Sequence, residues 1–382
     1  MQLAHRERVL KAVSHQMADR VPRDLGGTFT STIARGAHDS LLQYLGMEGE
    51  SKVIRKWARA VRPDERVLAR FDIDTRMVTP RHDDSWNEYW RLSPMSPEST
   101  RTDEWGVTWR RPETGPWFIS NHPLKAAQTI NDLDMHPFWP DPEDDERYYG
   151  LKEQARRLKE ETDYAVIGVF PRPVVSLSQF LRGYDTFFMD LALNHVMLEA
   201  VMDRILDLDL RIGERILSEI GSYVDIMFVH DDLATQESLM FSPDHYRKFV
   251  KPRHKKIFDC IKTHSDAKIL FHTDGAIRPL LDDLIEIGVD ALNPIQVSAA
   301  GMEPEKLAAD YGNRLCFWGG MDTQRVLNTG KPGEVRAEVR NLVRSLGGAG
   351  NYVIAAVHNI QDDVPPENVI ALFDAAEEFG IY

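Results

Sequence analysis

The sequence predicts an α/β fold, a single (β/α)8 barrel over residues 1–382 with an amino-terminal helix and a β-hairpin-containing insertion after the second strand. Two observations predict this class. Eight apolar runs of strand length recur along the chain, and the segments between them have helical periodicity. Alternating strands and helices form a parallel sheet, and eight such units favour a closed barrel over an open sheet. No Gly-x-Gly-x-x-Gly follows any run, so a dinucleotide-binding sheet is not favoured.

Most of the eight runs are nearly continuous in apolar residues, which is typical of strands that are covered on both faces, although residues 21–25 and 73–78 include charged side chains. Each run is followed within two residues by Gly, Pro, Asp, Asn or His, residues that favour a loop after a strand. Between the third and fourth runs, Ile205, Ile212 and Ile216 form an apolar stripe at helical spacing. The runs span residues 21–25, 73–78, 165–170, 225–229, 268–271, 289–292, 315–318 and 352–357.

Two regions fall outside this repeat. Residues 1–20 place Val9, Leu10 and Val13 on one face of a short amphipathic helix, which we expect at the bottom or flank of the barrel. Residues 80–150 are rich in Trp and Pro and alternate in character, which predicts a hairpin near the active-site mouth. Its aromatic residues can form a lid over a planar ligand or a satellite core under a long loop, and we favour the core for most of them. These residues are Trp86, Tyr89, Trp90, Trp105, Trp109 and Trp117.

Composition narrows the classes of function. The chain has 46 Lys and Arg against 60 Asp and Glu, and its net charge of −14 disfavours nucleic acids and anionic membranes as partners. Its two cysteines, Cys260 and Cys316, offer neither a disulfide framework nor a cysteine-rich zinc site. No apolar run approaches the roughly 18 residues of a membrane helix. We therefore expect a cytoplasmic enzyme with a small-molecule substrate.

Polar residues follow several strand runs, at the barrel end where βα loops build active sites. His272 and Asp274 follow the fifth run, and His358 follows the eighth. Two imidazoles and a carboxylate that converge above one barrel mouth can hold Zn²⁺ or a related divalent ion, with open positions for water or substrate. We therefore predict a metal site at these three residues. Separate histidines with structural hydrogen bonds are the alternative.

The fourth run ends in His230, Asp231 and Asp232, a segment that supports several roles. Two adjacent carboxylates repel each other unless a cation or a substrate hydroxyl offsets them, so one of them is a candidate general acid or base. The alternatives are that the pair caps a helix, or that one of the three residues replaces a ligand of the metal site. Asp74, near the second run, is a further catalytic candidate.

Candidate substrate-binding residues lie in the same set of loops. Arg76 and Arg172 are the cations best placed to pair with a carboxylate or phosphate, because guanidinium binds such groups bidentately. Either can instead neutralise a neighbouring aspartate. The uncharged candidates are His230, Gln236, Asn293 and Gln361.

Six segments, spread over nearly the whole chain, together resemble the uroporphyrinogen decarboxylase superfamily. The resemblance implies a (β/α)8 barrel and one of two chemistries. One is the cofactor-free decarboxylation of the acetate arms of uroporphyrinogen, and the other is zinc-dependent methyl transfer between a corrinoid protein and a thiol or pterin. The segments are Arg6-Glu7-Arg8-Val9-Leu10, Asp19-Arg20-Val21-Pro22, Phe180-Leu181-Arg182-Gly183, Phe271-His272-Thr273-Asp274-Gly275, Phe317-Trp318-Gly319-Gly320 and Pro365-Pro366-Glu367-Asn368-Val369.

For the methyltransferase branch, the resemblance implies a zinc site made by a His-x-Cys pair and a later Cys. His272 matches that histidine, whereas Asp274 and His358 stand where the two thiolates would be. The position of His358 is also a histidine in the decarboxylase branch, but the arginine-rich segment of that branch has no good counterpart in residues 21–27. Imidazoles and a carboxylate leave the ion harder than thiolates do, which favours oxygen or nitrogen ligands over a soft thiol.

We therefore predict a metal-dependent methyltransferase that moves a methyl group between a small methylated substrate, or a corrinoid carried by a partner protein, and an acceptor. The alternative enzyme is a lyase that decarboxylates a small carboxylated or tetrapyrrole-like substrate without metal, with His358 and Asp74 as its polar catalysts. A third interpretation is a non-catalytic binding protein that keeps the barrel. Barrels of this kind often pair through surface helices, so a homodimer is compatible with the sequence.

Overall fold

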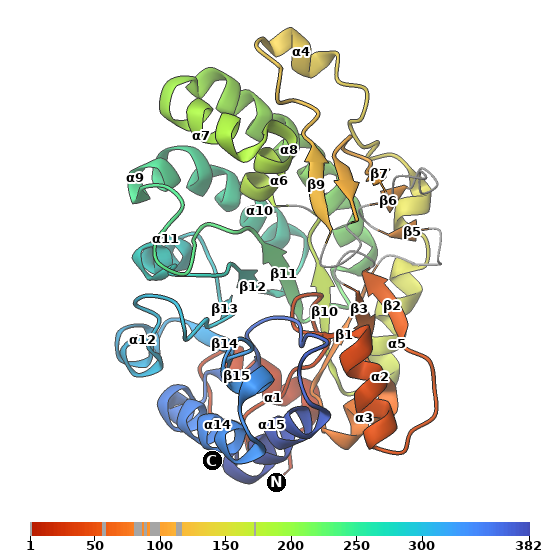
Figure 1. Ribbon diagram of the computed structural model, residues 1–382, viewed down its shortest axis with the longest axis vertical. Helices are drawn as coiled ribbons and strands as arrows, with labels where there is room; N and C mark the ends of the chain where they lie inside the picture. Colours follow the sequence, from red (N-terminus) through yellow and green to blue (C-terminus); the bar gives the residue numbers. More distant parts are fainter. Residues whose placement is uncertain are drawn as a thin grey trace.

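The computed structural model of the protein describes residues 2–55, 59–79, 86–87, 90–91, 100–111, 117–171 and 173–382. Seven parallel strands form the central sheet, in the order β15-β14-β13-β12-β11-β10-β4 (Figure 1). Each overlaps one of the apolar runs, so these seven predicted strands are confirmed. The strands are β4 (Thr75–Met77), β10 (Ala165–Val169), β11 (Ile226–His230), β12 (Lys268–His272), β13 (Ala291–Asn293), β14 (Cys316–Met321) and β15 (Tyr352–Ala356).

The first apolar run, residues 21–25, fills the gap between β15 and β4. The amide of Asp24 donates to the carbonyl of Ile354 at 2.9 Å, and the amide of Asp74 donates to the carbonyl of Arg23 at 3.0 Å. These bonds join the segment to both edges of the sheet and close the barrel. The segment is not a regular strand, because Pro22 has no amide hydrogen to donate. The predicted barrel class is therefore confirmed, with an irregular first strand.

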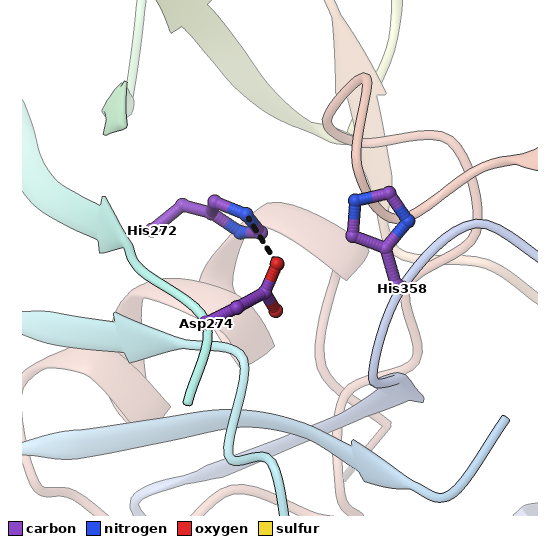
Figure 2. Close-up of side chains that lie close together, drawn as sticks. All are labelled: His272, Asp274 and His358. Atoms are coloured by element: carbon purple, nitrogen blue, oxygen red, sulfur yellow. Dashed lines mark ion pairs between the residues drawn. The ribbon is translucent and has the colours of Figure 1, made fainter. Parts of the chain in front are cut away.

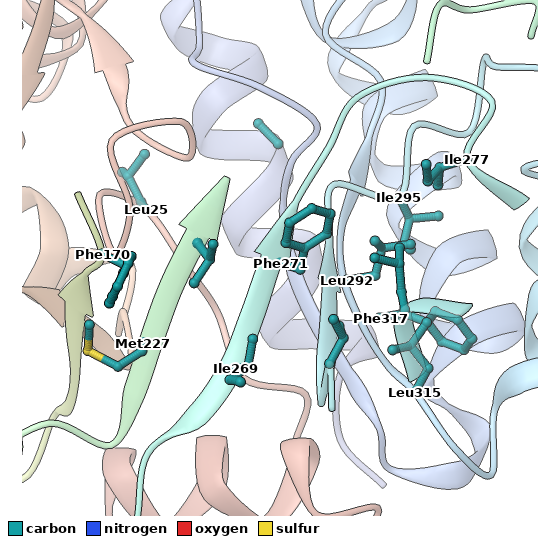
Figure 3. Packing of buried hydrophobic residues seen from close by; sticks show 14 of the residues in the cluster. Leu25, Phe170, Met227, Ile269, Phe271, Ile277, Leu292, Ile295, Leu315 and Phe317 are labelled. Atoms are coloured by element: carbon teal, nitrogen blue, oxygen red, sulfur yellow. The ribbon is translucent and has the colours of Figure 1, made fainter. Parts of the chain in front are cut away.

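Helices cover the outer face of the strands, and the main hydrophobic core lies between the two layers (Figure 3). The apolar stripe predicted in the long helix α8 is buried in this core. In the part of the chain that the structure describes, no helix combines the length and the apolarity needed to cross a bilayer. The helices of this layer are α2 (Arg35–Tyr44), α3 (Glu65–Arg70), α5 (Leu151–Glu161), α6 (Val174–Arg182), α7 (Tyr184–Leu193), α8 (His195–Ile220), α9 (Pro243–His245), α10 (Lys251–His264), α11 (Leu281–Glu286), α12 (Pro304–Tyr311), α13 (Val326–Thr329), α14 (Pro332–Leu346) and α15 (Pro366–Phe379).

Helix α1 (His5–Val13) closes the amino-terminal end of the barrel. Its residues Val9, Ala12 and Val13 are buried in one cluster with the inward-facing residues of the strands. Arg6 of the same helix donates to the carbonyl of Tyr164, directly before β10, at 3.1 Å. The expected helix at the bottom of the barrel is confirmed, and both chain termini are drawn near it in Figure 1.

A small antiparallel sheet that the sequence did not predict lies between the first barrel segment and β4. It contains β1 (Ile33–Ala34), β3 (Ala60–Arg62) and β2 (Lys52–Arg55), in that order. These strands are two to four residues long, too short to show a clear alternation of apolar and polar residues in the sequence.

The predicted insertion follows β4. Strand β5 (Trp86–Asn87) pairs with β6 (Trp90–Arg91), and β7 (Thr100–Thr102), β8 (Thr108–Arg110) and β9 (Phe118–Asn121) form a second antiparallel sheet. Helix α4 (Ile130–Asp134) lies beyond them, at the far end of the molecule in Figure 1. The expectation of a β-hairpin in this region is confirmed.

The described tryptophans of the insertion form a satellite core. Trp105 and Trp109 are buried against apolar residues of α6 and α8, and Trp117 packs on the same cluster. The indole of Trp109 donates to the carboxylate of Asp103 at 2.9 Å, which satisfies its buried N–H group. For these three residues the structure supports the satellite core over the lid. The side chains of Trp86, Tyr89 and Trp90 lie outside the described residues.

Candidate metal centre and active site

Three neighbouring strands bring polar residues into one row at the carboxyl end of the barrel. His230, the last residue of β11, lies in register with His272, the last residue of β12, and His272 lies in register with Asn293 of β13. This is the end of a parallel barrel at which βα loops supply active-site groups. His230 faces the barrel interior, where its ring meets that of Phe29 edge-on at 4.9 Å between centroids.

His272, Asp274 and His358, called the triad below, point toward one another (Figure 2). Each offers one nitrogen or oxygen atom, and these atoms all lie within 4.8 Å of one another. Nε2 of His272 is 3.7 Å from Oδ2 of Asp274, and the two imidazole rings are 6.0 Å apart at 60°. The structure therefore brings together the three residues that the sequence predicted as ligands.

The donor set of the triad fits a divalent ion. Zn²⁺ takes imidazole nitrogen and carboxylate oxygen at about 2.0–2.2 Å, and catalytic sites usually combine three protein ligands with one open position. Asp274 is 35% exposed, so its carboxylate has room to turn toward an ion held between the two histidines. Two imidazoles and one carboxylate also suit other divalent metals, so the donor set does not select zinc alone.

The buried amide of Asn293 orients His272. Nδ1 of His272 lies 2.6 Å from Oδ1 of Asn293 and 3.2 Å from the hydroxyl of Thr30. When Nδ1–H donates to that amide oxygen, the lone pair of the imidazole is on Nε2, the atom that faces Asp274. Metal-binding histidines are commonly held in this way by a group that accepts from their other nitrogen.

The loop of residues 26–32 reaches the triad through Thr30 and is anchored by Asp24. The carboxylate of Asp24 accepts from the amide of Gly27 at 2.8 Å and from the indole of Trp318 at 2.8 Å. A Cβ atom at Gly27 would lie 2.4 Å from Oδ1 of Asp24 and 2.5 Å from Oγ1 of Thr75. Glycine is thus required here because the loop lies so close to these side chains.

Asp231 anchors a helix. It is 1% exposed and accepts from the amides of Val175 and Ser176 at 2.8 and 2.9 Å, at the amino-terminal end of α6. Its other neighbour is Nε2 of His254, at 3.1 Å. For Asp231 the structure supports the alternative of a helix cap over a catalytic role, although the helix is the one after the preceding strand.

Asp232 is the carboxylate of this pair that faces the triad. Burial raises its pKa to about 6, the negative charges of Asp274 and Asp231 add to this effect, and the charge of His272 opposes it. The backbone amide of Asp274 donates a hydrogen bond to it. Asp74, Asp231 and Asp232 were the predicted acid–base residues, and of these Asp232 is the one whose carboxylate faces the triad.

Asp74 lies at the opposite end of the barrel. It directly precedes β4 and accepts from Arg8 at 2.6 Å, from Arg20 at 2.8 Å and from His5 at 2.8 Å. Burial opposes its ionisation, but the hydrogen bonds and charges of these three residues hold the pKa of Asp74 below its ordinary value. A catalytic role at the mouth is therefore wrong, because the strand begins after Asp74 rather than ending before it.

Of the two predicted arginines, the one that the structure describes does not lie at the mouth. Arg76 pairs with Glu65 at 2.8 Å and lies over the ring of Tyr164 at 3.7 Å, on the outside of the barrel near its amino end. Its expected contact with substrate is therefore wrong, because its guanidinium is already used by these two partners. Arg172 lies outside the described residues.

A cavity of about 640 Å³ lies beside the triad and includes Asp274 and His358 in its wall. Two predicted substrate-binding residues, Gln236 and Gln361, line it, whereas Asn293 acts on His272 instead. The other amide residues of the wall were given no separate role. Gln296 and Asn359 follow strand runs and so belong to the polar residues expected at the mouth, whereas no pattern marked the remaining two. These residues are Gln296, Gln324, Asn328 and Asn359.

Comparison with known proteins agrees with this architecture. The family model "Uroporphyrinogen decarboxylase (URO-D)" matches residues 103–379. The uroporphyrinogen decarboxylase of Methylococcus capsulatus is 22% identical over 277 residues, 70% of this chain and 72% of that protein. That of Thermus thermophilus is 24% identical over 241 residues, 59% of this chain and 63% of that protein. A methyltransferase from Methanosarcina mazei shares the fold, with a TM-score of 0.66 and 19% identity over 99% of both chains. The chain therefore belongs to the uroporphyrinogen decarboxylase family.

Proposed function

We propose that this protein is a metal-dependent methyltransferase in which the triad holds Zn²⁺ or a related divalent ion. The observation that carries the proposal is the convergence of the three side chains within 4.8 Å, with Nε2 of His272 facing Asp274. An ion held there would supply Lewis acidity, which lowers the pKa of a methyl acceptor or stabilises the oxygen that a methyl group leaves. The full-length similarity in fold to a methyltransferase is compatible with this reaction.

The transfer requires the protein to position two substrates and to move one proton. The bond between the methyl carbon and its donor breaks with the electron pair on the donor, and the acceptor forms the new bond with its own electron pair. Where the small substrate is the acceptor, its oxygen or nitrogen gives up a proton to Asp232 beside the triad; where it is the donor, the oxygen or nitrogen that keeps the electron pair takes a proton from the acid form of Asp232. Asn293 keeps His272 in the tautomer that points its lone pair inward, and Gln236 and Gln361 line the space for the substrate.

The replacement of thiolates by imidazole and carboxylate guides our choice of substrate. Such a ligand set favours oxygen and nitrogen over a soft thiol. We therefore propose that the methyl group is bound to oxygen or nitrogen in the small substrate and is exchanged with a corrinoid carried by a partner protein. Incubation with methylcobalamin and a series of oxygen, nitrogen and thiol acceptors, followed by absorbance, tests this; loss of the methylcobalamin spectrum with thiols alone would contradict it.

Metal analysis of protein purified without an affinity tag tests the centre. We expect close to one ion per chain, and a loss of this ion in His272→Ala and His358→Ala. An occupancy far below one that added Zn²⁺ does not raise would rule out the metal centre. Light scattering of the same preparation tests the predicted homodimer.

The decarboxylases among the similar proteins favour a metal-free lyase as the second candidate. The predicted pair of catalysts for it, His358 and Asp74, does not form, because Asp74 lies at the other end of the barrel. A lyase would have to rely on His358 and Asp232 instead. Release of carbon dioxide from candidate acids, unaffected by a chelator, would support the lyase over the methyltransferase.

A further inference from the structure

The cavity beside the triad presents hydrogen-bond donors whose orientation the protein fixes. Oε1 of Gln296 accepts the amide of Gly275 at 2.7 Å, and Oδ1 of Asn359 accepts the amide of Thr32 at 2.9 Å. A backbone N–H can only donate, so the side-chain oxygen must face it and the NH₂ group must be directed elsewhere. Gln296 is 6% exposed and Asn359 is 2% exposed, and across the described residues neither NH₂ group has a protein partner.

Both NH₂ groups belong to residues that line the cavity, so they offer it two N–H donors. A ligand oxygen that meets them gains hydrogen bonds without reorienting either side chain, so the cavity is suited to a molecule that supplies an acceptor.

The charge of the wall disfavours an anionic group in this part of the cavity. Its described residues include the carboxylates of Asp274 and Asp363 but no lysine or arginine. A carboxylate or phosphate placed among the amides would lose water without gaining a counter-ion from them, whereas an uncharged group would keep all of its hydrogen bonds.

We propose that this cavity binds an uncharged amide group of the substrate, a carboxamide or a cyclic amide. Its carbonyl oxygen accepts from the NH₂ groups of Gln296 and Asn359, and its N–H group meets a wall whose charged groups are carboxylates, which accept hydrogen bonds. The inference rests on the proposed function, because it places the methyl group of the same molecule at the triad. It adds the chemical class that the cavity recognises.

A matched pair of probes tests the class of ligand. Benzamide and benzoate have nearly the same shape and differ in charge and in the N–H donor. We expect the full chain to bind benzamide about tenfold more tightly than benzoate in titrations followed by ligand NMR, carried out in EDTA so that benzoate cannot bind an ion at the triad. Equal binding, or tighter binding of benzoate, would overturn the proposal; loss of benzoate binding in Arg172→Gln would then identify the cation responsible.

Variants test which residues make the contact. Gln296→Glu keeps an acceptor for the amide of Gly275 but removes the NH₂ donor, so we expect benzamide affinity to fall about tenfold or more. Gln43→Glu makes the same change of charge on the exposed side of α2 and should leave the affinity within about twofold. If Gln296→Glu does not fold, Asn359→Asp keeps an acceptor for the amide of Thr32 and removes the other NH₂ donor. Wild-type benzamide affinity in every folded variant would refute the assignment.

Metal content separates this proposal from the proposed function. His358→Ala is expected to lose the ion, and benzamide binding that persists in it and still depends on Gln296 would support the amide site even where methyl transfer is absent. Zinc binding and methyl transfer without any preference for benzamide would leave the proposed function in place and reject the amide site.

Discussion

The two ends of the barrel are both rich in charged and polar residues, but they differ in how far these groups are satisfied. At the amino end, the carboxylate of Asp74 accepts from Arg8, Arg20 and the amide of Arg23, so that both oxygens are used. At the carboxyl end, the triad atoms lie apart by up to 4.8 Å, and Asn328 keeps a buried acceptor without a partner. A buried carboxylate is therefore a poor guide to function by itself. Unused hydrogen-bonding capacity is a guide only beside an open cavity, because Nε of Arg23 at the amino end is also buried without a partner among the described residues.

The largest expected effect is on stability at the amino end. Asp74→Asn removes the charge that pairs with Arg8 and Arg20, and leaving buried charges without a partner typically costs about 3–5 kcal/mol. Urea unfolding measures this loss. Asp72→Asn is the matched control, because Asp72 pairs with Arg20 but is 44% exposed, and it should cost about 1 kcal/mol or less. Equal losses in both variants would contradict the difference in burial.

The dependence on pH sharpens the same prediction. Because the pKa of Asp74 is lowered in the folded protein, its stabilisation is present above the unfolded value of about 4 and is lost as the pH falls through the lower folded value. The wild type should thus lose stability steeply below about pH 4, and Asp74→Asn should show a shallower decline. Parallel pH profiles for the two proteins would mean that Asp74 does not carry this stabilisation.

The second effect concerns the carboxyl end, where we expect loss of metal with little loss of stability. Asp274→Ala removes one of the three proposed ligands, so zinc affinity should fall more than about 100-fold in a chelator competition. Urea unfolding in the presence of EDTA should change by about 1 kcal/mol or less, because Asp274 is partly exposed. Asp282→Ala, on the exposed side of α11, controls for loss of a carboxylate. Unchanged zinc affinity in Asp274→Ala would show that Asp274 is not a ligand of the metal.

A smaller effect is expected from the amide that orients His272. Asn293→Ala removes the acceptor for Nδ1–H and should weaken zinc binding about 10- to 100-fold. Asn293→Asp keeps an oxygen at this position and should recover most of the affinity. The ¹⁵N chemical shifts of His272 report its tautomer directly. If Asn293→Ala binds zinc as tightly as the wild type, Asn293 does not position this ligand.

The smallest effect is expected for Arg76. Its partner Glu65 is 67% exposed, so Arg76→Gln should cost about 1 kcal/mol of stability, partly through the lost contact with Tyr164. Zinc and benzamide affinities should stay within about twofold of the wild type, because the side chain lies outside the barrel at the amino end. If Arg76→Gln weakens benzamide binding tenfold or more, Arg76 contributes to the substrate site after all.

The barrel could be predicted because its strands are covered on both faces, which leaves a nearly continuous apolar run for most of them. The insertion could be placed by its tryptophans, and their packing on α6 and α8 follows from their size and apolar character. The sheet β1-β3-β2 could not be predicted, because its short strands are fixed by their neighbours rather than by a pattern of their own.

The site could be predicted only in part. The triad residues follow strand runs directly, so the topology alone brings them to one end of the barrel. Asp231 and Asp232 are adjacent in the chain, yet one faces α6 and the other faces the triad, a difference that tertiary packing sets. Asp74 was misplaced because an apolar run does not show at which residue the strand pairing begins. Asn328 comes from a short helix with no distinctive sequence.

The anchoring of α6 by Asp231 has a consequence for how this protein can diversify. At the other end of that nine-residue helix, Arg182 donates to the carbonyls of Leu124 and Ala127 in the insertion. Helix α6 thus connects the insertion to Asp231, the residue next to Asp232. Mutations in the insertion can change which substrates reach the mouth while α6 keeps Asp231 and Asp232 in place. The substrate specificity of this protein can therefore change without changes in its reacting groups.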